Sequence, residues 1–133
     1  MVIVKSVIGS WAHSRSIGDT VVVYAGEYLN KLDGERIERE CLSKFDSGCR
    51  ALVINFKDTA VINSIGVSVL LCVIDAAEES HAQIVFTNVN HHITQLLELL
   101  GLMRHVTLTD SEDLAVALLN RPAPNPSTIS RLC

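Results

Sequence analysis

The sequence predicts an α/β fold, in which one domain has a mostly parallel or mixed β-sheet with helices packed against it. The chain has 133 residues, close to the commonest size of a single domain. Apolar residues make up 48% and aromatic residues only 5%, so Val, Ile, Leu and Ala must fill one core. Short apolar runs alternate with longer amphipathic segments in the order β-β-α-β-α-β-α-β-α. That alternation is typical of parallel strands joined by right-handed helical crossovers.

The sequence predicts two strands at the start of the chain, one much more clearly than the other. Val2–Ile8 is a weak candidate. Thr20–Ala25 is strong, because it is β-branched and continuously apolar, as expected of a strand covered on both faces. Residues 10–19 are rich in polar and turn-forming residues and are predicted to form a loop. The pair is compatible with an antiparallel edge of the sheet.

The first predicted helix runs from Gly34 to about Asp46, with Asp33 as its N-cap. Its apolar stripe has four-residue spacing and consists of Ile37, Cys41 and Phe45. A second buried strand, Ala51–Phe56, follows, and residues 57–63 are predicted to form a loop.

A long helix is predicted next, from Ser64 to about Glu79. Its expected buried face is Val67, Leu70, Leu71, Ile74 and Ala77. The remaining elements are a strand at Gln83–Thr87, a helix at Ile93–Leu100 closed by Gly101, a short strand at Val106–Leu108, and a last helix to about Leu119. Thr109 to Glu112 fits a capping box at the start of that last helix.

The composition changes abruptly after Asn120. All three prolines lie in residues 121–133, which are predicted to form an extended or flexible tail. We therefore expect one domain over residues 1–120 and a tail over 121–133.

Charge and hydropathy exclude several classes of partner. The net charge is −4 and the charged residues are scattered, which argues against nucleic acid and against an anionic membrane surface. The longest apolar run, Val67–Ile74, is far below the ~20 residues that a membrane-spanning helix needs. The N-terminus lacks the pattern of a signal peptide. A soluble, cytoplasmic protein is expected.

The four cysteines, Cys41, Cys49, Cys72 and Cys133, have no C-x-x-C spacing. Cys41 and Cys72 lie among apolar residues and are interpreted as small core residues, which fits a reducing compartment. No metal and no cofactor is predicted. The adjacent His91 and His92 point about 100° apart on a helix and so cannot readily share a metal.

The most distinctive segment for chemistry is Asn63-Ser64-Ile65-Gly66. It lies where a predicted strand end meets a helix N-terminus, which is where α/β sheets form their sites. The first N–H groups of a helix have no intrahelical acceptor, and the helix dipole is positive there, so an anion is well tolerated. On local pattern alone, an ordinary helix cap is the favoured interpretation.

A family resemblance adds to this interpretation. The stretch Ala51–Leu71, ALVINFKDTAVINSIGVSVLL, resembles the signature of the STAS domain family, in which an apolar strand and a short loop lead to Asp-Ser-x-Gly and an apolar helix. Gln83–Val89 resembles the next strand of the family and Leu96–Leu102 its L-x-x-x-G-L helix ending. Gly26-Glu27 resembles its G-x-L motif. The resemblance covers roughly residues 2–119.

The resemblance implies a regulatory protein-binding module rather than an enzyme. Free-standing members of the family bind an anti-sigma factor that is a serine kinase, and so regulate transcription. The kinase phosphorylates a hydroxyl of the signature, and a cognate phosphatase removes the phosphate. On this chain Ser64 is then the expected phosphoacceptor, and Asn63, Ser64, Ile65 and Gly66 form the expected partner-binding and anion-binding loop. A homodimer is left open.

Three positions depart from the family pattern. Asn55 and Asn63 replace aspartates, which keeps hydrogen bonding but removes two negative charges, and Ile65 replaces a second hydroxyl residue. Two alternatives to the phosphorylated switch therefore stay open. One is a non-phosphorylated scaffold subunit of a signalling or transport complex. The other is a nucleotide- or small-molecule-binding STAS domain. The motifs G-x-S-x-G, G-x-G-x-x-G and the P-loop are absent.

Overall fold

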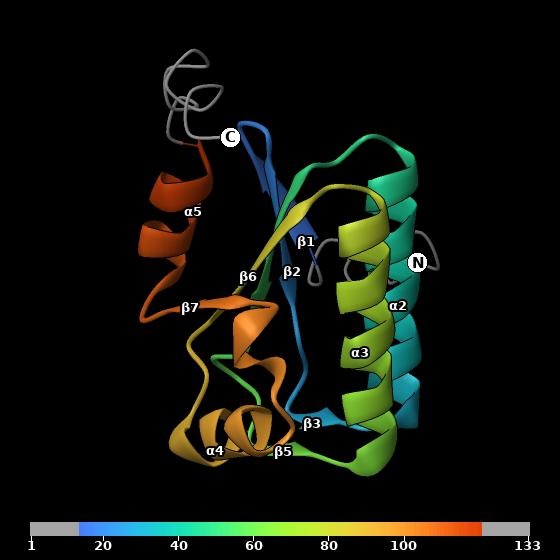
Figure 1. The fold of residues 1–133 in the computed structure, drawn as a ribbon, viewed down its shortest axis with the longest axis vertical. Coiled ribbons are helices and arrows are strands. Elements are labelled where there is room, and N and C mark those ends of the chain that lie inside the picture. The colour runs from blue at the N-terminus through green and yellow to red at the C-terminus, as the bar shows by residue number, and fades with distance from the viewer. Residues whose placement is uncertain (1–13, 121–133) are drawn as a thin grey trace, which may run out of the picture.

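The computed structural model describes residues 14–120, and a five-stranded sheet lies at its centre (Figure 1). The strand order is β1-β2-β4-β6-β7. β1 (Ser14–Ile17) is antiparallel to β2 (Thr20–Tyr24). β2, β4 (Ala51–Asn55), β6 (Gln83–Thr87) and β7 (Thr107–Thr109) are parallel to one another. The predicted α/β fold with a mixed, mostly parallel sheet is confirmed.

Helices cover both faces of this sheet. α2 (Lys31–Asp46) and α3 (Ser64–Glu79) lie side by side on one face, and α5 (Glu112–Asn120) lies on the other (Figure 1). α4 (His91–Leu99) and a 3-10 turn (Leu102–Arg104) complete the α2–α3 side. Successive residues of each central strand point to opposite faces of the sheet, and helices cover both faces. This explains why the central strands are continuously apolar.

The two cores differ greatly in size. The larger one, beneath α2, α3 and α4, includes Val23, Ile37, Ile54, Phe86 and Ile93. The smaller one, beneath α5, has four buried members, which are Val22, Val53, Val85 and Ala115. α5 therefore has little buried apolar surface of its own to hold it on the sheet.

A second, two-stranded sheet is a feature that the sequence did not reveal. β3 (Tyr28–Leu29) pairs in parallel with β5 (Val61–Ile62) beside the start of α3 (Figure 1). Two residues are too few to show the period-two alternation of a strand, so residues 57–63 were expected to be loop throughout.

The prediction that residues 10–19 form a loop is wrong in part, because β1 occupies Ser14–Ile17. β1 is an edge strand with Arg15 and Ser16 exposed, so it lacks the apolar pattern of the central strands. Gly18 has a φ of 62° and makes the turn into β2. The predicted strand Val2–Ile8 and the tail 121–133 lie outside the described residues.

Two predicted helix caps are corrected by the structure. α2 begins three residues early because Asn30, not Asp33, is its N-cap and accepts from the Asp33 N–H at 3.1 Å. At α5 the Ser111 hydroxyl, not that of Thr109, accepts the Leu114 N–H at 3.2 Å. The bounds of α3 and β6 are as predicted, and Gly101 ends α4 with a φ of 73°.

The buried face of α3 is predicted correctly in part. Leu70, Ile74 and Ala77 are buried as predicted and Val67 is partly buried, but Leu71 is exposed. Val69 and Val73 are buried instead, and Cys72 is exposed. Apolar residues surround nearly the whole helix, so their spacing does not identify the inner face. Cys72 is therefore not a core residue, whereas Cys41 is fully buried, and its burial raises the pKa of its thiol.

Candidate functional site

The Asn63–Gly66 segment forms the N-terminus of α3, as predicted. Asn63 is the N-cap, and its Oδ1 accepts from the Gly66 N–H at 2.8 Å. The Asn63 N–H donates to the Leu29 carbonyl of β3 at 3.1 Å. Ser64 is the first residue of the helix and is exposed, so its hydroxyl is accessible from solvent. The N–H groups of Ser64 and Ile65 have no acceptor within the helix, which leaves partial positive charge beside that hydroxyl.

Gly66 brings the helix into direct contact with β3. A Cβ at this position would lie 2.2 Å from the Leu29 carbonyl oxygen, much closer than any real contact, so no larger residue fits without moving backbone. Gly66 therefore permits close packing of α3 against β3. This contact fixes where the α3 N-terminus, and with it Ser64, lies on the surface.

Exposed apolar side chains lie near the Asn63–Ser64 cap of α3. Tyr28, Val61 and Ile65 are each close to half exposed, and Leu32 at the start of α2 is 78% exposed. On the other side, an open groove of about 300 Å³ runs between α3 and α4 and is lined by Ile62, Asn63, Ser64, Val67, Leu96 and Leu100. Exposed apolar groups gathered around one polar loop are characteristic of a protein-binding surface.

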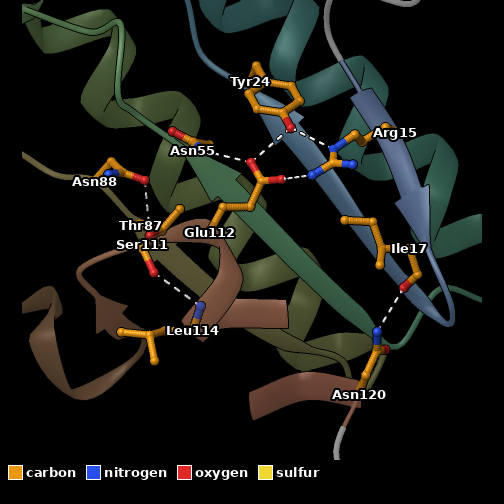
Figure 2. Close-up of polar contacts among 10 residues, drawn as sticks. All are labelled: Arg15, Ile17, Tyr24, Asn55, Thr87, Asn88, Ser111, Glu112, Leu114 and Asn120. Atoms are coloured by element: carbon orange, nitrogen blue, oxygen red, sulfur yellow. Dashed lines mark hydrogen bonds and ion pairs between the residues drawn. The ribbon is translucent and has the colours of Figure 1, made fainter. Parts of the chain in front are cut away.

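Asn55 does not lie with the Asn63 loop. It ends β4 with its side chain on the α5 side of the sheet, where it is only 2% exposed (Figure 2). Its Nδ2 donates to Glu112 Oε1 at 2.9 Å, and its Oδ1 accepts from the Lys57 N–H at 2.8 Å. Both ends of the amide are therefore used, and an aspartate here would direct a second carboxylate at Glu112.

Glu112 is the centre of a polar cluster that the sequence did not reveal, since we assigned this residue only to the start of the last helix. Its carboxylate accepts from Arg15, from the Tyr24 hydroxyl at 2.8 Å and from Asn55 (Figure 2). Arg15 Nε also donates to the Tyr24 oxygen at 2.8 Å. One carboxylate thus joins β1, β2 and β4 to α5.

The ionisation of this cluster follows from its contacts. Burial alone would raise the pKa of Glu112, but the hydrogen bonds from Arg15, Tyr24 and Asn55 outweigh it and lower that pKa below its ordinary value of 4.5. Burial, followed by the hydrogen bond to Glu112, raises the pKa of Tyr24 above 10.0. Glu112 is therefore ionised at neutral pH and acts as a multiple acceptor.

The other residues singled out in the sequence do not form a second site. His91 and His92 are exposed at the start of α4, and His105 Nδ1 lies 2.9 Å from Glu78 Oε2 on the surface. Among residues 14–120, no group of three or more His, Cys, Asp or Glu side chains is arranged to hold a metal ion. In that same part of the chain, no helix combines the length and apolar character that crossing a bilayer requires.

Comparison with known families identifies the class of protein. The STAS domain family model matches residues 13–115, well over half of the chain. The chain belongs to the STAS domain family. A search among curated proteins finds no significant match.

Solved structures with the same fold share little sequence with the chain. TM1081 of Thermotoga maritima, a candidate anti-sigma factor antagonist, is 17% identical with a TM-score of 0.74, over 81% of this chain and 93% of that chain. Unphosphorylated SpoIIAA, an anti-sigma factor antagonist of Bacillus, is 16% identical with a TM-score of 0.70, over 83% and 98%. A chain of the stressosome is 21% identical with a TM-score of 0.65, over 80% and 98%.

Replacing Gly66 with alanine should destabilise the protein and displace the start of α3. The added methyl group meets the Leu29 carbonyl, which is backbone and cannot rotate away. We expect a loss of roughly 1–3 kcal/mol in the free energy of unfolding, measured by urea denaturation. Ser68→Ala, one turn further along α3, is the matched control and should cost much less. Equal stability of Gly66→Ala and the wild type would contradict the close contact.

Glu112→Gln should remove an acid-dependent share of stability. The lowered pKa means that this share is complete above pH 4.5 and is lost as the pH falls from there through the folded-state pKa. At pH 7 the variant should therefore be less stable by roughly 1–3 kcal/mol, and the difference should shrink toward pH 3. Asp113→Asn, at the exposed neighbouring position, is the control. A difference between wild type and Glu112→Gln that stays constant from pH 7 to pH 3 would refute the assignment.

Proposed function

We propose that the chain is a regulatory protein-binding module of the anti-sigma factor antagonist type, not an enzyme. In this proposal it binds a serine-kinase anti-sigma factor through the Asn63–Gly66 loop. Phosphorylation of Ser64 by that kinase ends the binding, and a cognate phosphatase restores it. In this proposal the chain, the partner kinase and the phosphatase are all cytoplasmic.

One observation carries the proposal. The Ser64 hydroxyl is exposed at a helix N-terminus, beside the exposed Ile65 and the apolar groove between α3 and α4. The exposed Tyr28 and Leu32 line a second hollow together with the adjacent Asn63. An apolar surface of this kind favours docking of another protein, and a hydroxyl in its centre is accessible to a kinase. The likeness in fold to SpoIIAA, which has been solved with and without its phosphate, supports the same role.

A phosphate on Ser64 would act at this surface in two opposite ways. It would bring about −1.5 to −2 charges to a helix N-terminus whose free N–H groups accommodate an anion. The same charge would lie among Tyr28, Val61 and Ile65, where an apolar partner surface would have to desolvate it. Phosphorylation would therefore be tolerated by the fold and would oppose docking.

The cysteines support a cytoplasmic location for the chain. Cys41, Cys49 and Cys72 are all free thiols in the described residues. Free thiols are typical of a reducing compartment, where an ATP-dependent kinase also operates.

A constitutive scaffold subunit is the second candidate function. It is favoured by Ile65, which offers the surface an apolar side chain where the family pattern has a second hydroxyl, and by the stressosome chain among the similar folds. The two candidates differ in what a negative charge at position 64 does. Ser64→Asp should abolish partner binding by a switch and should leave binding by a scaffold unchanged.

The switch is tested by phosphorylation in solution. Incubation with a serine-kinase anti-sigma factor and ATP should add one phosphate to the protein, detected as a mass gain by mass spectrometry. Ser64→Ala should abolish the gain, and Ser68→Ala, an exposed serine on the next turn of α3, should retain it. A gain that persists in Ser64→Ala would exclude Ser64 as the acceptor.

A further inference from the structure

The last helix contacts the sheet through one small apolar cluster and through polar contacts at its two ends. At its start Glu112 accepts from Arg15, Tyr24 and Asn55. At its end Asn120 accepts from the Thr20 hydroxyl at 2.6 Å. It also donates to the Ile17 carbonyl at 3.0 Å (Figure 2). Ala115 is the one α5 residue that is fully buried between them. The two ends of α5 contact different parts of the sheet. Glu112 contacts Asn55, from which the chain continues to Ser64, whereas Asn120 contacts Thr20 and Ile17.

The hydrogen-bonded path from Glu112 to the Ser64 loop runs through the Asn55 amide. Asn55 is the last residue of β4, and residues 56–63 lead from it to the N-cap of α3. Its Nδ2 donates to Glu112, and its Oδ1 accepts the backbone N–H of Lys57, the second residue of the connection. The carboxylate therefore fixes the rotation of the Asn55 amide, and the amide fixes the first turn of the connection.

The Asn55 amide requires an acceptor oxygen at position 112. Glu112 Oε1 accepts from both Tyr24 and Asn55, whereas Oε2 accepts from Arg15. A glutamine whose carbonyl oxygen takes the place of Oε1 would keep both Oε1 contacts and lose Arg15, whereas alanine removes the acceptor of all three donors. Arg15 is half exposed and can turn to water, whereas the Asn55 amide is buried and cannot. In Glu112→Ala the loss is therefore concentrated on Asn55, because a buried donor without an acceptor is costly and is relieved by rotating the amide.

We propose that Glu112 is a positioning residue for the connection that carries Ser64, acting through Asn55 on the Lys57 N–H, and that α5 and the Ser64 loop are thereby coupled. Only the consequence for partner binding rests on the proposed function. The coupling itself is a property of the fold and is measured without any partner.

Amide hydrogen exchange, followed residue by residue by NMR, tests the coupling. In Glu112→Ala the exchange of the Lys57 amide should become faster by about tenfold or more, relative to the slowest core amides of the same variant. Asn120→Ala is the matched control, since it releases the opposite end of α5. It should speed exchange near Thr20 and leave Lys57 unchanged. Equal effects of both variants on Lys57 would mean that Glu112 merely attaches the helix, and would overturn the proposal.

The double variant tests whether Glu112 acts through Asn55. Asn55→Ala removes the acceptor of the Lys57 N–H, so it should speed exchange at Lys57 by itself. Adding Glu112→Ala to Asn55→Ala should then produce no further change at Lys57. Additive effects of the two substitutions would contradict the path.

A titration that needs no substitution in the cluster covers the case in which Glu112→Ala does not fold. Arg15 and Tyr24 face the carboxylate from β1 and β2, Lys57 lies over the Tyr24 ring, and Asp110 and Asp113 are its neighbours along the chain. Asp58→Asn removes the carboxylate adjacent to Lys57. In that background, the Lys57 amide shift should titrate with the same midpoint as the Glu112 carboxyl carbon. A Lys57 shift that does not follow Glu112 would overturn the proposal, whatever the outcome of the phosphorylation test.

Discussion

The surface around Ser64 depends on one backbone contact, the approach of α3 to the Leu29 carbonyl of β3. Because residue 66 lacks a side chain, the first turn of α3 can lie directly against that carbonyl, and the Asn63 N–H donates to the same oxygen. The contact also holds the β3–β5 pair in register, with Leu29 opposite Ile62. Two short strands that would be marginal alone are stabilised by a helix packed on their ends. Ser64 therefore lies on a rigid platform, formed by the first turn of α3 with β3 and β5, rather than on a free loop.

The two sides of the sheet are held by different forces. Beneath α2, α3 and α4, a large core of Val, Leu, Ile and Phe provides the stability that fixes the platform. Beneath α5 the apolar contact is small, and hydrogen bonds to Glu112 and Asn120 take a larger share. A charge-assisted contact of this kind is directional, so it sets the position of α5 and of Asn55 more sharply than apolar packing alone would. The arrangement links the small core on one face to the platform on the other.

How much of this could be predicted from the sequence depended on the range of the interaction. The bounds of α3 and β6 follow from local signals, since Asn63 caps a long apolar helix and Gln83–Thr87 is a run of strand-forming residues. β1, β3 and β5 are edge or two-residue strands that are fixed by their partners rather than by their own pattern. Glu112 meets Arg15 and Asn55 across 97 and 57 residues of chain, and no local spacing indicates such a pairing. The Asn63–Gly66 loop was found because helix caps and glycines are local features, whereas the exposed faces of Leu32, Val61 and Leu71 required the packed structure.

The central claim, that the face around Ser64 is the docking surface, is tested most directly by a hydrogen-exchange footprint of the bound partner. The protein would be compared free and in complex with a serine-kinase anti-sigma factor in the absence of ATP. The account predicts slower exchange at residues 28–32 and 61–68, and unchanged exchange in α5. Protection confined to α5 or to the β7 edge, with residues 61–68 unchanged, would contradict it.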